Sequence, residues 1–136
     1  MKYLVDANVL SEATKSQPAP VVLQWLAVND AHLLVNPIIL GELEYGIRLL
    51  PRGKRRTQLQ EWFDRGRKQL NCMAIDADTA GRWASLLADL KRKGKAMPVK
   101  DSLIAASALQ HDLTVATRNV ADFKKAGVST VNPFEL

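Results

Sequence analysis

Short apolar runs alternate with segments of helical periodicity along most of the chain. The apolar runs predict five buried strands, over residues 2–5, 32–35, 73–75, 113–117 and 128–131. Helical spacing predicts helices over residues 20–28, 37–50, 54–70, 76–93 and 102–109. Strands that alternate with helices are typical of α/β proteins. We therefore expect a three-layer α/β/α sandwich around a mostly parallel five-stranded sheet.

Two features refine this picture of the core. Residues 102–109 (SLIAASAL) are apolar almost all round, which predicts a helix buried against the sheet. Trp25, Trp62 and Trp83 each fall on an apolar stripe, which favours packing over stacking on nucleic-acid bases.

Length and composition place the chain among ordinary globular proteins. It has 136 residues, of which 47% are hydrophobic and 24% charged, so we expect one domain over residues 1–136. No apolar run is long enough to span a bilayer, and Asp6 ends the first one too early for a signal peptide. Cys72 is the only cysteine, which excludes an intrachain disulfide and favours the cytoplasm. The formal net charge of +5 suits a polyanionic partner.

Acidic residues interrupt the apolar sequence at two telling places. Asp6 directly follows the first strand, so we expect it at the carboxyl edge of the sheet, where open α/β sheets bind ligands. Asp101 precedes the apolar helix and reaches the same edge if that helix packs on the sheet. Each residue also has a purely structural interpretation, as a cap of the turn or helix that follows it.

Helical geometry places two glutamates of the helix over 37–50 on different sides of that helix. At about 100° per residue, Glu42 lies about 40° from Ile38, inside an apolar arc that also holds Ile39 and Leu49. Glu44 lies about 240° from Ile38, near Arg48, on the polar side. A carboxylate in an apolar arc is costly unless it is paired or binds a metal, so Glu42 is either a site residue or half of a buried ion pair.

A further set of polar residues follows the fourth strand. Thr117 and Asn119 come directly after that strand and Asp122 a turn later, although turn and cap chemistry explains Asn119 and Asp122 equally well. Carboxylates gathered this closely repel one another unless a cation lies among them. Oxygen ligands without cysteine or suitably placed histidine favour Mg²⁺ or Mn²⁺ over zinc. Such a pocket in a basic protein suggests metal-assisted hydrolysis of phosphate esters.

These segments, taken in order, resemble the PIN-domain family, and within it the VapC-type ribonuclease toxins of toxin–antitoxin pairs. The resemblance covers nearly the whole chain. It rests on residues 3–12 (YLVDANVLSE), 41–43 (GEL) with Gly46, 101–106 (DSLIAA), 115–123 (VATRNVADF) and 131–134 (VNPF). The ordered set is specific, whereas the first motif alone is not.

The resemblance implies Mg²⁺-dependent cleavage of single-stranded RNA, with Mn²⁺ able to substitute. Asp6, Glu42 and Asp101 match the three acids that gather the metal. The family's fourth acidic position falls on Asn119, which leaves open whether Asn119 or Asp122 completes the catalytic site and whether one or two metals bind. Thr117 matches a position whose hydroxyl hydrogen-bonds the acids or a bound water. The resemblance also implies a homodimer and a VapB-type antitoxin whose C-terminal segment obstructs the acidic pocket.

Other functions fit parts of the same sequence. A PIN-like fold that only binds RNA or a partner remains an alternative, although the three acids argue against it. An aspartyl-phosphate phosphatase needs a second aspartate where Asn8 stands. No phosphate-binding GxxxxGK[ST] loop occurs, and His32 and His111 lie too far apart in the pattern to predict an acid–base pair.

Basic residues gather in three clusters, over 52–56, 65–68 and 91–95. They either contact the phosphate backbone of RNA or form solvated surface and complement helix C-termini.

Overall fold

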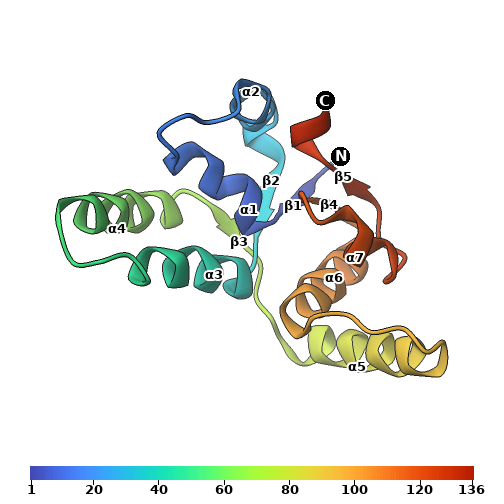
Figure 1. Ribbon diagram of the computed structural model, residues 1–136. Helices are drawn as coiled ribbons and strands as arrows, with labels where there is room; N and C mark the ends of the chain where they lie inside the picture. The colour runs from blue at the N-terminus through green and yellow to red at the C-terminus, as the bar shows by residue number, and fades with distance from the viewer.

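A five-stranded sheet runs through the centre of the computed structural model, which describes residues 1–136 (Figure 1). The strands are β1 (Tyr3–Val5), β2 (Leu33–Val35), β3 (Asn71–Cys72), β4 (Thr114–Ala116) and β5 (Thr130–Val131). Their order is β3-β2-β1-β4-β5, and every neighbouring pair is parallel. The predicted five-stranded sheet is confirmed, and it is parallel throughout. All carboxyl ends of its strands therefore meet at one edge.

Helices account for most of the remaining chain. The α-helices are α1 (Ala7–Leu10), α2 (Pro20–Val28), α3 (Pro37–Arg48), α4 (Lys54–Arg67), α5 (Ala77–Arg92), α6 (Val99–His111) and α7 (Val120–Lys124). Three short 3₁₀ turns are η1 (Ser11–Thr14), η2 (Asp30–His32) and η3 (Pro133–Glu135). No helix combines the length and the apolar character needed to cross a membrane.

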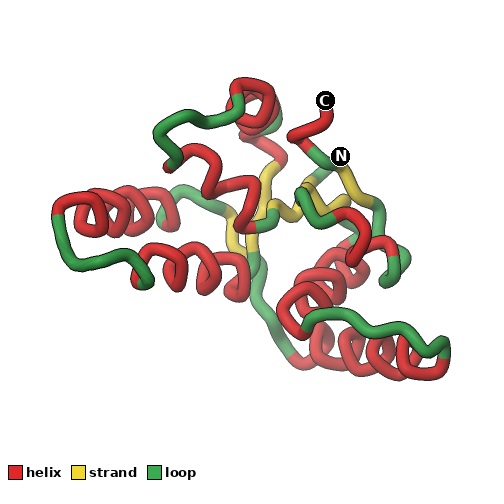
Figure 2. The backbone as a smooth tube through the Cα atoms, in the orientation of Figure 1, coloured by secondary structure: helices red, strands yellow, loops and turns green.

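The helices form layers on both faces of the sheet, as the predicted sandwich requires (Figure 2). Alternation along β1 divides the core, because successive side chains of a strand point to opposite faces. Leu4 belongs to a large cluster with residues of α3, α4, α5 and α6. Val5 belongs to a smaller cluster with Val22 and Trp25 of α2. Trp25 is buried and Trp83 donates a hydrogen bond to Ser102 at 2.9 Å, which agrees with a packing role for both.

Local signals explain where the long helices begin. Asn36 caps α3 by accepting a hydrogen bond from the Ile39 amide at 3.0 Å, and Pro37 occupies the first turn, which suits its fixed φ. Asp76 caps α5 in a reciprocal capping box with Thr79. Asp76 is therefore the cap of α5, and Asp78 lies within its first turn.

The structure corrects two predicted boundaries and adds two short helices. The third strand is Asn71–Cys72 and not residues 73–75; it is an exposed edge strand, so the apolar run that marks a buried strand is missing there. Helix α6 begins at Val99, three residues before the predicted start, because Val99 and Lys100 are exposed and Asp101 is charged, so the apolar run that marks the helix starts later. The short helices α1 and α7 have no full apolar period and were not predicted.

Candidate active site

Asp6 lies at the carboxyl end of β1, buried to 4% exposure, as predicted from its position after the first strand. Its Oδ1 accepts a hydrogen bond from the Ala7 amide at 2.8 Å, so it also caps α1. Its Oδ2 accepts bonds from the Thr117 hydroxyl at 2.8 Å and from the Asn8 amide group at 3.3 Å. The capping interpretation is thus correct, but it uses one oxygen only. The other oxygen faces Thr117, whose predicted hydrogen bond to the acids is confirmed.

Asp101 lies in the first turn of α6 and is 8% exposed. Its Oδ2 accepts a hydrogen bond from the Asn119 side-chain amide at 3.1 Å. The same Asn119 nitrogen donates to Asp122 at 2.7 Å, and Lys125 also contacts Asp122, at 3.2 Å. Asn119 makes no side-chain cap of α7. Asn119 therefore contacts the buried acid directly, whereas Asp122 is joined to it through Asn119.

Glu42 differs from its predicted setting. Its side chain is 20% exposed and that of Glu44 is 25% exposed, so burial does not separate the two glutamates. The buried stripe of α3 is centred on Ile39, Leu43 and Ile47, which leaves Glu42 at its margin and Leu49 in solvent. The predicted apolar arc was therefore wrong in its extent, because it counted Ile38 and Leu49 as core.

Partners do separate the two glutamates. Glu44 binds Arg48 at 2.9 Å and Gln60 at 3.2 Å, on the outer side of the α3–α4 pair. Glu42 Oε2 lies 3.3 Å from Lys100 Nζ, and Glu42 Oε1 is buried without a hydrogen-bond partner. A buried ion pair was one of the two interpretations of Glu42; Lys100 does pair with it, but the pair is exposed to solvent on the lysine side.

Sequence reasoning did not identify two of the residues that shape this edge. Asn36, fully buried after β2, donates to the Ser107 hydroxyl at 3.1 Å and so ties α3 to α6. Its position between a strand and a proline is a helix-cap signal that could have found it. Lys100 carried no such signal, because its partner is 58 residues away in the chain.

The carboxylates act on one another electrostatically. Burial, followed by the charges of Asp6, Asp122 and Glu42, raises the pKa of Asp101 to about 6. Burial likewise raises the pKa of Asp6, against the hydrogen bonds from Thr117 and Ala7. Burial and then the charge of Asp6 raise the pKa of Glu42, and Lys100 opposes both. Asp6, Glu42 and Asp101, from three separate elements, therefore share one electrostatic site.

The chemistry of these donors can be compared with what a divalent cation needs. Three carboxylates without histidine or cysteine are the oxygen ligands that suit Mg²⁺ or Mn²⁺, and the unpartnered Glu42 Oε1 is an acceptor still available. No group of three or more such side chains yet converges on a single point. Protein donors hold each acid instead: Thr117 on Asp6, Lys100 on Glu42 and Asn119 on Asp101. The residue types therefore fit a hard cation, while Thr117 and Asn119 hold Asp6 and Asp101 in fixed orientations.

An apolar cavity of about 310 Å³ adjoins the acids. Residues of α1, η1, α3 and α4 line it, among them Leu43, Ile47, Leu59 and Trp62, and Glu42 belongs to the same lining. The cavity therefore offers an apolar surface that is continuous with a carboxylate of the acidic site.

Comparisons with known proteins agree with this architecture. The PIN domain family matches residues 3–128. The chain is 35% identical to VapC ribonuclease Y4jK of Sinorhizobium fredii, over 97% of each chain. It is also 35% identical to toxin FitB of Neisseria gonorrhoeae, over 96% of this chain and 97% of the relative. The crystal structure of FitAcB from N. gonorrhoeae superposes with a TM-score of 0.92 at 34% identity, covering 98% of this chain and 99% of that one.

A parallel sheet in the order β3-β2-β1-β4-β5, with buried acids at its carboxyl edge, defines an α/β protein whose acids lie where open α/β sheets bind ligands. The chain belongs to the PIN-domain family, and the resemblance stated from its motifs is confirmed.

Proposed function

We propose that this protein is a divalent-metal-dependent endoribonuclease that cleaves single-stranded RNA and acts as the toxin of a toxin–antitoxin pair in the cytoplasm. The observation that carries the proposal is the grouping of Asp6, Glu42 and Asp101, which do not meet at one point but lie close enough for the charge of Asp6 to raise the pKa of both Glu42 and Asp101. Relatives that cover almost the whole chain are named a ribonuclease and a toxin, which supports the same assignment.

In this proposal Asp6, Glu42 and Asp101 hold the cation, which is Mg²⁺ with Mn²⁺ as a substitute. When bound, such a cation activates water and stabilises the charge on the leaving oxygen of a phosphodiester. The Thr117 hydroxyl fixes the rotamer of Asp6 through its 2.8 Å hydrogen bond. Asn119 orients Asp101 in the same way, and Asp122 keeps the Asn119 amide in place. These contacts position the acids before substrate arrives, which lowers the cost of assembling the site.

A polar cleft on the α3–α4 hairpin offers arginine contacts to an RNA substrate. Arg48, Arg52 and Arg56 line it together with Glu44, Glu61 and Asp64, and Glu44 pairs with Arg48. Arg52 and Arg56 are therefore the candidates for phosphate contacts, which position a nucleic acid without reading its sequence. Single-stranded RNA is then selected by the shape of its loop rather than by this cleft.

Two aspartates on α6 provide the test. Asp101→Asn removes a carboxylate of the site, whereas Asp112→Asn changes the exposed residue at the far end of the helix, where φ is 54° and Asn is well tolerated. With purified protein, Mg²⁺ and labelled single-stranded RNA, we expect Asp101→Asn to lose about 10-fold or more of the cleavage rate. Asp112→Asn should cleave like the wild type. Wild-type activity in Asp101→Asn would show that cleavage does not depend on this carboxylate, and an inactive wild type would favour the alternative, a PIN-like module that binds without cleaving.

The apolar cavity beside Glu42 supports an antitoxin as the protein partner. An amphipathic helix fits an apolar surface, and a basic residue that follows it would be attracted to the adjoining acids. We expect the chain to arrest growth when expressed alone and to be silenced by co-expression of its neighbouring antitoxin gene. The variant Leu59→Asp, which places a charge in the cavity, should escape silencing while still cleaving RNA. Silencing of Leu59→Asp at wild-type antitoxin levels would rule out this docking surface. A homodimer stays a prediction from the family.

A further inference from the structure

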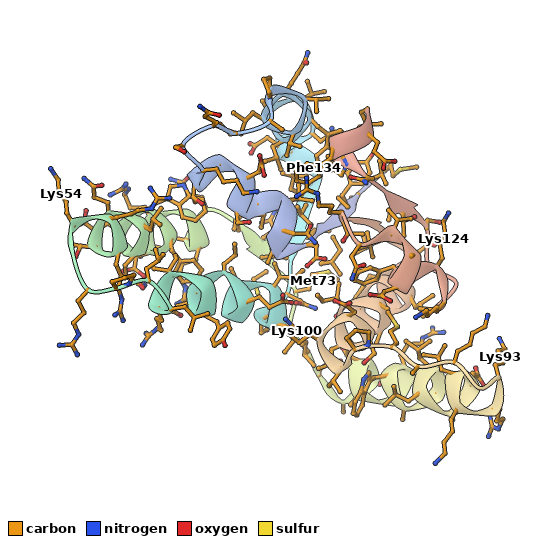
Figure 3. All side chains as sticks on the ribbon, in the orientation of Figure 1. Lys54, Met73, Lys93, Lys100, Lys124 and Phe134 are labelled. Carbon is orange, nitrogen blue, oxygen red and sulfur yellow. The ribbon has the colours of Figure 1, made fainter.

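Lys100 is the one basic residue whose side chain makes an ion pair with any of the three acids Asp6, Glu42 and Asp101. Its Nζ lies 3.3 Å from Glu42 Oε2, and the pair joins the first turn of α6 to the first half of α3. Figure 3 labels Lys100 where the beginnings of these two helices approach each other. The lysine side chain is 65% exposed, so it can leave Glu42 at little desolvation cost.

The position of Lys100 within its helix is unfavourable on local grounds. The N-terminal turn of a helix carries partial positive charge, which favours acids such as Asp101 and disfavours a lysine. The stabilisation of this lysine must therefore come from outside α6. Its positive charge acts on Asp6, Glu42 and Asp101, and in each case it opposes the rise in pKa that burial causes. Lys100 thus lies close enough to influence all three acids.

The same ion pair accounts for the arrangement of Glu42. Lys100 holds Oε2 while Oε1 stays buried without a hydrogen-bond partner, so half of the carboxylate is unused. Asp6, Glu42 and Asp101 do not converge on one point. The Glu42 carboxylate, which pairs through one oxygen with an exposed ammonium, is suited to exchange that cation for another.

We propose that Lys100 is a tethered counter-cation, which neutralises Glu42 when the acidic site holds no metal and gives up that carboxylate when a divalent ion binds. Lys100 is thus a positioning residue, and this inference rests on the proposed metal site. Because lysine and metal compete for the same carboxylate, removing the ammonium strengthens metal binding and destabilises only the metal-free protein.

The test is Mn²⁺ binding to the full chain without RNA, measured by titration calorimetry. Lys100→Gln should lower the Kd about 3- to 10-fold, because an ion pair and a repulsion between two cations are both removed. Lys93→Gln, at the end of α5, makes the same change in net charge and should leave the Kd unchanged. Lys100→Arg keeps the charge and should stay close to the wild type.

A double-mutant cycle ties the effect to Glu42. In a Glu42→Gln background, adding Lys100→Gln should lower the Kd for Mn²⁺ by a smaller factor than in the wild-type background, because the shared carboxylate is gone and only the repulsion between the two cations is removed. In chelator, Lys100→Gln should melt below Lys93→Gln, and saturating Mn²⁺ should remove that difference.

Two failures are distinguishable. If the wild type binds Mn²⁺ and Lys100→Gln binds it equally or more weakly, the counter-cation role is wrong and the metal site stands. If the wild type binds no Mn²⁺ at millimolar concentration, the metal-dependent function itself is wrong, and this inference with it.

Discussion

Glu42 and Glu44 allow the account to be tested within one helix and by one kind of substitution. They are two residues apart on α3, and their side chains are almost equally exposed. Replacing either by glutamine keeps the shape and removes one negative charge. Any difference between the two variants therefore reports on the surroundings of each carboxylate group, rather than on helix propensity or on the exposure of the whole side chain.

The structure predicts opposite effects on stability. Arg48 and Gln60 lower the pKa of Glu44, so its charge is favoured in the folded protein, and Glu44→Gln should lose about 0.3–0.5 kcal/mol, as for other pairs four residues apart. Burial and the charge of Asp6 raise the pKa of Glu42, so its charge is disfavoured in the metal-free fold. Glu42→Gln should therefore melt at or above the wild-type temperature in chelator.

The structure predicts the reverse for activity. Losing a metal ligand or its close support costs about 10- to 100-fold, so Glu42→Gln should lose that much of the cleavage rate at saturating Mg²⁺. Glu44→Gln should cleave like the wild type. Initial rates on labelled single-stranded RNA, with thermal melts by circular dichroism, measure both effects. Equal rates, or an inactive Glu44→Gln beside an active Glu42→Gln, would refute the placement of the site on this helix.

Three further outcomes are expected. In chelator, the melting temperature of the wild type should rise as the pH falls from about 6 toward 4, because the pKa of Asp101 is about 6 in the folded protein and near 3.8 in the unfolded chain. Asp101→Asn should flatten this rise. Identical pH profiles of the variant and the wild type would contradict the prediction. Thr117→Val should lower the free energy of unfolding in denaturant by about 1–3 kcal/mol, since the Asp6 carboxylate and the Asn119 backbone amide each lose a hydrogen-bond partner. Thr117→Ser keeps both hydrogen bonds. Equal losses of stability in the two variants would show that the hydroxyl is unimportant. Charge reversal at Arg52 or Arg56 should make the plot of log affinity for RNA against log salt concentration shallower, by about 0.7 in slope for each phosphate that the variant no longer neutralises. An unchanged slope would show that the cleft is ordinary solvated surface.

The parts of the fold that sequence predicted are those with strong local signals. The apolar runs around Leu4, Leu34 and Val115 identified β1, β2 and β4 because these central strands are buried on both faces. The edge strand β3 was displaced by two residues in the prediction because Asn71 and Cys72 are both exposed. Periodicity reports burial, so it fails where a strand lies at the margin of the sheet.

The candidate site was predictable to a similar degree. Asp6 and Asp101 were located by their places beside an apolar strand and an apolar helix, both of which are local features. The exposure of Glu42 could not be predicted, because it depends on which side of α3 the sheet and α4 cover. Lys100 was missed for the same reason: only the packing of α6 against α3 brings it to Glu42.

Removal and return of the metal test the central claim most directly. Purified protein, treated with excess EDTA and given labelled single-stranded RNA, should show no cleavage. Mg²⁺ added beyond the chelator should restore it, because the site gathers carboxylates and has no histidine to act without a cation. Asp101→Asn in the same assay should stay inactive after Mg²⁺ is returned. Full wild-type cleavage in excess EDTA would contradict the account.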